Sequence, residues 1–78
     1  MKNLYIFQNN KKIAQILPGI EGVDRMIFEN EITDESCKKI QNILVNFRQV
    51  KPNSTEGDIK QLFEENGFVV LFEDELKR

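Results

Sequence analysis

The sequence has no histidine and a single cysteine, Cys37, and both shortages limit what the chain can do. One cysteine cannot form an internal disulfide, and one thiol without imidazole offers too few ligands for a structural zinc site. Without histidine, catalysis would depend on other acids and bases, and the sequence brings no two of them together. Cys37 itself lies on the apolar stripe of a predicted helix, as a small core residue does. The sequence therefore predicts no catalytic residue, no metal site and no cofactor.

Long hydrophobic runs and a strong charge of one sign are also missing. The apolar run at residues 4–7 is too short for the core of a signal peptide or for a membrane span. The 13 acidic and 11 basic residues leave a net charge of −2, and the pI is near 5.1. We therefore expect a cytoplasmic protein that binds no membrane and has no general affinity for polyanions.

The length of 78 residues predicts a single domain, residues 1–78, near the lower size at which a chain buries a sufficient core. Domains of this size often gain stability from disulfides, from metals or from association. The composition argues against the first two of these. Association with a partner is the remaining source of extra stability.

Two strand-like runs, at residues 4–7 and 12–17, flank the pair Asn9 and Asn10. Asparagine tolerates the positive φ that tight hairpin turns need, so the two runs predict a β-hairpin. Simple alternation places one set of side chains of the second run on the same side: Ile13, Gln15 and Leu17. Residues 25–29 predict a third strand. A short helix over residues 20–27 is the alternative, which two glycines disfavour.

Two helices are predicted from their start signals. Thr33 is a good N-cap, and the acidic residues that follow it suit the positive end of the helix dipole. Apolar residues at helical spacing then continue until Pro52, before which the helix must end. Thr55 and Asp58 stand three positions apart, a carboxylate variant of the capping box that predicts the start of the second helix.

Gly67 predicts the end of the second helix and the start of the last strand. Glycine readily takes the left-handed conformation that follows many helices, and Phe63 and Phe68 stand where the side chains of a Schellman motif meet. Residues 68–72 then form a strand, and a charged tail follows at residues 73–78.

The predicted fold is α+β: a small two-layer domain with the order β-β-(β)-α-α-β. We expect a mainly antiparallel sheet with two helices on one face. The last strand returns to pair with the hairpin or with the third strand. Because it is apolar on both faces, a central position suits it best.

The first and last strands do not alternate between apolar and polar residues, although the two helices can cover only one face of the sheet. One alternate set is assigned to the helix side: Leu4, Ile6, Val69 and Leu71. The other set is assigned to the second face, although the assignment can be reversed: Tyr5, Phe7, Phe68, Val70 and Phe72. Either the segment that contains Ile20, Val23 and Met26 folds over this second face, or another molecule covers it.

The surplus of apolar side chains favours a non-enzymatic protein that binds another protein or a second copy of itself. Small inhibitors, immunity proteins and anti-defence proteins of phages and mobile elements share this size and composition, and such a role is our first hypothesis. The alternative is a small nucleic-acid-binding regulator that uses the basic face of the first helix. Its candidate residues are Lys38, Lys39, Arg48 and Lys51. The second helix is acidic and would repel phosphate, which makes nucleic acid the weaker hypothesis.

Overall fold

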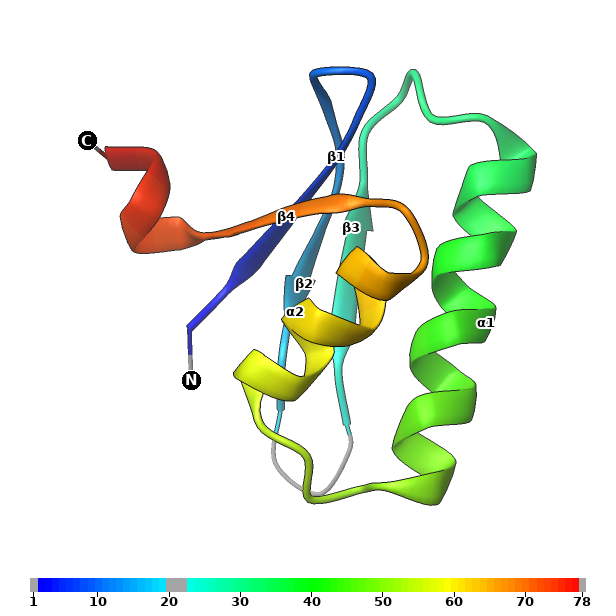
Figure 1. The fold of residues 1–78 in the computed structure, drawn as a ribbon. Helices are drawn as coiled ribbons and strands as arrows, with labels where there is room; N and C mark the ends of the chain where they lie inside the picture. Colours follow the sequence, from blue (N-terminus) through cyan, green and yellow to red (C-terminus); the bar gives the residue numbers. More distant parts are fainter. Residues whose placement is uncertain (1, 20–22, 78) are drawn as a thin grey trace.

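The computed structural model describes residues 2–19 and 23–77, and in it an antiparallel sheet carries two helices on one face (Figure 1). The elements in chain order are β1 (Leu4–Gln8), β2 (Lys11–Leu17), β3 (Arg25–Phe28), α1 (Asp34–Val50), α2 (Glu56–Glu65), β4 (Val69–Phe72) and a short 3-10 helix, η2 (Glu73–Lys77). The predicted α+β class and the order of elements are confirmed, including the third strand. No helix in the described ranges is long and apolar enough to cross a membrane.

The hairpin between β1 and β2 turns at the asparagine pair. Asn9 and Asn10 have φ angles of 53° and 65°, and Gln8 pairs with Lys11 across the turn. Two consecutive residues with positive φ match the twist of the flanking strands, which is why such turns are common in hairpins. The predicted hairpin is confirmed.

Both helices begin at the predicted N-caps. The Thr33 hydroxyl accepts a hydrogen bond from the Ser36 backbone N–H at 3.1 Å, at the start of α1. At α2, the Asp58 N–H donates to the Thr55 hydroxyl at 3.3 Å, and the Thr55 N–H donates to the Asp58 carboxylate at 3.0 Å. This reciprocal pair satisfies two backbone donors that the first helical turn leaves without partners.

The junction between α2 and β4 is the predicted Schellman motif. Gly67 has a φ of 90°, and the Phe68 N–H donates to the Phe63 carbonyl at 3.1 Å. The two phenylalanine rings meet edge to face, with their centroids 6.0 Å apart. The helix therefore ends with its last carbonyls satisfied, and the chain leaves it toward the sheet.

The sheet order is β3-β2-β1-β4, with every neighbouring pair antiparallel. The expected central position of the last strand is therefore wrong, because β4 is an edge strand next to β1. Short connections already place β1 and β3 on the two sides of β2. A strand that returns from the helices can then join the sheet only at an outer edge.

A β-bulge in β2 changes the side on which one residue lies. Ile6 pairs with Ala14, but the next residue, Phe7, pairs with Lys12, so Ile13 is extra. Ile13 and Ala14 are both buried in the core. The alternation that grouped Ile13 with Gln15 and Leu17 is therefore wrong at this position, because a bulge places two residues of one strand opposite a single partner.

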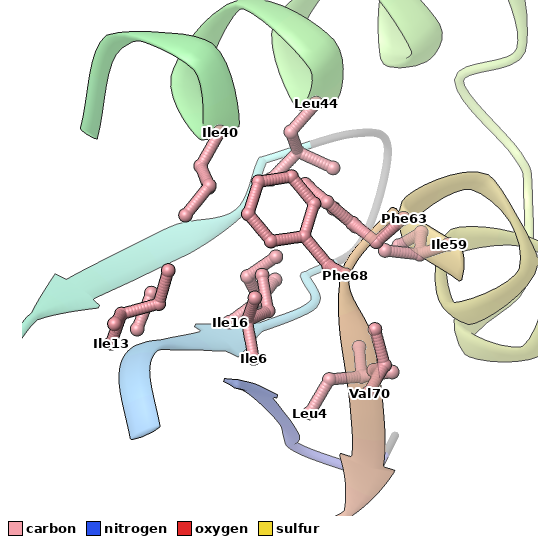
Figure 2. Packing of buried hydrophobic residues seen from close by; sticks show 11 residues of the cluster. Leu4, Ile6, Ile13, Ile16, Ile40, Leu44, Ile59, Phe63, Phe68 and Val70 are labelled. Carbon is pink, nitrogen blue, oxygen red and sulfur yellow. The ribbon is translucent and has the colours of Figure 1, made fainter. Parts of the chain in front are cut away.

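The core lies between the sheet and the two helices. Figure 2 shows Ile40 and Leu44 of α1 and Phe63 of α2 above the strands, with Phe68 among them. The buried set is completed from α2 and the strands: Leu4, Ile6, Ile13, Ala14, Ile16, Ile59 and Val70. One face of the sheet is thus fully used by the helices.

Candidate protein-binding surface

The pairing of β1 with β4 decides which side chains share a face. Ile6 stands opposite Val70, and Tyr5 stands opposite Leu71. Directly opposite residues of an antiparallel pair point to the same side of the sheet. Ile6 is buried under the helices, so Val70 lies there with it. Leu71 accordingly shares the other face with Tyr5.

The predicted division of the faces is right for β1 and wrong for β4. Phe68 and Val70 are core residues, 4% and 2% exposed, and Phe72 packs against the same core. The physical reason is the helix end, since the Schellman motif directs Phe68 onto Phe63. Alternation along the strand then keeps Val70 and Phe72 on the helix side. Of the five predicted interface residues, Tyr5 and Phe7 are on the second face.

The face of the sheet that points away from the helices carries apolar side chains from all four strands. We call it the open face; its apolar members are Tyr5, Phe7, Leu17, Ile27, Val69 and Leu71. Its central row runs Ile27, Gln15, Tyr5, Leu71 across the whole sheet, from one edge to the other. The sequence pattern contained the signal for this surface, but Ile27, Val69 and Leu71 could be placed there only from the register.

The open face is accessible to solvent. Val69 is 60% exposed and Ile27 is 47% exposed, at the two edges of the sheet. Tyr5, Phe7 and Leu17 on the two inner strands are half-buried by their neighbours, and so is Leu71 on β4. Contiguous apolar patches above a few hundred Å² are rare on monomers and mark interaction sites.

The irregular segment before β3 was the expected cover for this face. Val23 is 72% exposed and so covers nothing. Met26 stands opposite Ile16 and packs against the core on the helix side. Ile20 lies outside the described residues. At the other end of the chain, Glu75 of η2 pairs with Lys60 of α2 at 3.3 Å, which places Glu75 on the helix side as well.

Charged and polar groups surround the open face. Lys12 forms an ion pair with Glu29 at 3.1 Å, and its ammonium lies 5.1 Å from the Tyr5 ring centroid. At one end of β4, the Asn3 amide donates to the Glu73 carboxylate at 3.2 Å. The exposed Arg25 lies on the edge strand β3. An apolar centre inside a polar rim is the usual anatomy of a protein interface.

The predicted nucleic-acid residue Arg48 is instead part of a buried network. Arg48 is 6% exposed, and its guanidinium donates to the Asp24 carboxylate at 2.9 and 2.7 Å. The Nη1 group donates to the Ser54 carbonyl and hydroxyl at 2.9 and 3.2 Å, and to the Pro52 carbonyl at 3.2 Å. The Gly19 N–H donates to the same Asp24 carboxylate at 3.1 Å. These bonds join the connection after β2 to the last turn of α1 and to the segment between α1 and α2.

This network removes Arg48 from any phosphate-binding surface, so its assignment to one is wrong. The hydrogen bonds that Arg48 donates to the Asp24 carboxylate raise the pKa of Arg48 further above its ordinary value. Arg48 takes the last-turn position that a solvated cation often occupies, and its partner is distant in sequence. No local pattern in the chain indicates this pairing.

The other basic candidates, Lys38, Lys39 and Lys51, are exposed along α1 and just after it. The Lys39 ammonium lies 5.3 Å from the Phe68 ring centroid, and the Lys51 ammonium lies 5.9 Å from that of Phe47. Both ammonium groups thus lie over aromatic rings at the border of the core, which is a common use of a long basic side chain.

Cys37 is half-buried in the first turns of α1. Within residues 2–19 and 23–77, no three histidine, cysteine or carboxylate side chains gather in a way that could hold a metal ion. The hollow beside the hairpin is lined by side chains that are paired with each other, Lys11 with Glu31 and Lys12 with Glu29.

No protein-family model, curated protein or solved structure matches this chain. The surface is therefore interpreted from its own geometry and composition. A wide and mainly apolar sheet face suits a protein surface better than a small molecule, which needs a concave site.

Proposed function

We propose that this protein acts by binding a protein through the open face. The observation that supports it is the central row of the open face, in which Ile27, Tyr5 and Leu71 are interrupted by Gln15 alone, on a sheet whose helices α1 and α2 lie on the other side. Covering these side chains stabilises a complex by about 25 cal/mol for each Å² of apolar surface that is removed from water. Tyr5 and Phe7 are of the aromatic types that are enriched at interfaces.

We propose further that the protein is not an enzyme. The support for this is the composition without histidine and the candidate surface itself, which is the face of a sheet. The more specific role as an inhibitor, immunity or anti-defence protein stays a prediction based on size and composition. The nucleic-acid alternative has lost one of its four candidate residues, because Arg48 is buried.

The test compares two double variants that add the same charges at different surfaces. I27K/V69K places two lysines on the open face, at positions 47% and 60% exposed. V45K/V50K places two lysines on α1, at positions 48% and 77% exposed. Immobilised wild-type chain and each variant are used to capture proteins from a lysate of the source organism. We expect I27K/V69K to lose the proteins that the wild type and V45K/V50K retain.

Circular dichroism and thermal melting confirm that all three proteins are folded before capture. Equal capture by I27K/V69K and the wild type would show that the open face is not the binding surface. Loss of capture only in V45K/V50K would assign binding to α1 instead.

A further inference from the structure

We propose that the molecule seated on the open face is a second copy of this chain, packed sheet to sheet about a two-fold axis parallel to the strands. This inference rests on the proposed function and names the partner for the same surface. It follows from the way in which charges and apolar side chains are distributed across the face.

One row of the open face carries opposite charges at its two ends. Arg25 stands opposite Leu17, at the β3 edge. The same row continues at Asn3, just before β1, and ends at Glu73, just after β4, whose backbone N–H donates to the Asn3 carbonyl at 3.0 Å. The side-chain hydrogen bond from Asn3 to Glu73 places both groups on one side. Arg25 has no ion pair with any residue that the structure describes.

The two-fold axis lies midway between the two sheets and parallel to the strands. It places each row of one copy opposite the same row of the other copy, and it reverses the order of the strands. The β3 edge of one copy then faces the β4 edge of the other. Arg25 of each copy faces Glu73 of the other, and the apolar Ile27 faces Leu71 in the central row. Symmetry forms each contact twice, which is the property of an isologous interface.

The other in-plane axis, perpendicular to the strands, fits the charges less well. It would reverse the rows within each strand, so that Arg25 meets Glu29 of the other copy, but it would place Glu73, which bonds to the Asn3 amide and not to a cation, against the apolar Val69. With the axis parallel to the strands it is Glu29 that meets Val69, and Glu29 keeps its ion pair with Lys12 at 3.1 Å. Burying a carboxylate against an apolar side chain without a cation is costly. The arrangement with the axis parallel to the strands is therefore the self-complementary one.

The size of the open face suits a modest dimer. Strands about 4.8 Å apart and same-face residues about 6.8 Å apart give a surface of roughly 20 Å in each direction. Such a face has an area of roughly 400 Å² per copy, about half of the roughly 800 Å² of a typical stable interface. Paired sheets cross at about 30°, and the long side chains of Arg25 and Glu73 can follow this offset. We therefore expect a weak dimer that forms below millimolar concentration.

The test uses sedimentation equilibrium of the pure protein and of the charge-reversal variants R25E and E73R. The wild type should show a concentration-dependent equilibrium between monomer and dimer. Each single variant creates two like-charge contacts in its own dimer and should dimerise at least about tenfold more weakly. R25K and E73Q serve as matched controls that alter the same positions without reversing a charge.

Mixing the two single variants provides the decisive measurement. In a mixed dimer the new Glu at position 25 faces the new Arg at position 73, and the native Arg25 faces the native Glu73. We expect the mixture to dimerise within about threefold of the wild type, although neither variant does so alone. Loss of folding in either variant cannot produce such a rescue.

A wild type that stays monomeric at millimolar concentration would overturn the proposal, as would a mixture that shows no rescue. I27K/V69K separates the two proposals. If the wild type is monomeric but this variant still loses a captured protein, self-association is wrong and the proposed function stands. If the variant changes neither dimerisation nor capture, both are wrong.

Discussion

Single residues determine the turns of this chain. Asn9 and Asn10 accept positive φ at the hairpin, and Gly67 accepts it after α2. These backbone conformations depend on the residue itself, which is why the sequence alone identified them. By contrast, no local pattern identified the bulge at Ile13, because a bulge is defined by the pairing of two strands.

Two glycines in and near α2 should respond in opposite ways to alanine. Gly67→Ala places a Cβ at a φ of 90° and should lower the free energy of unfolding by about 1–2 kcal/mol. Gly57 lies in the first turn of α2 with room for a Cβ, since the nearest atom, the Thr55 hydroxyl oxygen, would be 3.6 Å from it. Gly57→Ala should therefore stabilise by about 0.4–1 kcal/mol. Urea denaturation of both variants measures the difference, and effects of equal sign would contradict this account.

Each helix was predictable as an element because its boundaries depend on neighbours within four residues. The N-caps Thr33 and Thr55 and the Schellman motif at Gly67 all form as expected. The strands were predictable in their existence but not in their order or facing. β4 lies at the edge next to β1 because β2 already has a neighbour on each side, and this pairing is a property of the whole sheet.

The capping box of α2 should make stability depend on acid pH. The hydrogen bond from the Thr55 backbone N–H lowers the pKa of Asp58 below its ordinary value. A lowered pKa in the folded state means that the cap stabilises above the unfolded pKa, about 3.9, and is lost as the pH falls through the folded pKa. In urea denaturation from about pH 5 to 2, Asp58→Asn should lose less stability than the wild type.

Asp34→Asn is the control for this experiment, because it removes one carboxylate from the first turn of the other helix. The pKa of Glu75 is also lowered, by the hydrogen bond from the Phe72 backbone N–H, so the Asp58 variant retains part of the acid dependence. An unchanged slope in Asp58→Asn would show that the capping box does not contribute to it.

At the scale of the whole molecule, one buried ion pair connects segments that are distant in sequence. Asp24, Arg48 and Ser54 join the connection between β2 and β3 to the last turn of α1 and to the segment between the two helices. The apolar core lies between the helices and the sheet, whereas this network closes one end of the two layers. Arg48 was expected on a solvated face, and only the approach of Asp24 made its burial favourable.

Arg48→Met should lower the free energy of unfolding by about 3–5 kcal/mol, because it leaves the Asp24 carboxylate buried without its cation. Lys38→Met, on the exposed side of the same helix, should change it by less than about 0.5 kcal/mol. Urea denaturation of both variants provides the comparison. If Asp24→Asn leaves the free energy of unfolding unchanged and Arg48→Met is as stable as the wild type, the ion pair does not hold these segments together.

The sequence by itself determined the helices, the turns, the α+β class and the surplus of apolar side chains in the first and last strands. These properties depend on local backbone preferences and on composition. Only the tertiary structure decided that Val69 and Leu71 lie on the open face while Phe68 and Val70 lie in the core. The reason is that side chains alternate along a strand, so a shift of one residue in where β4 begins exchanges its two faces.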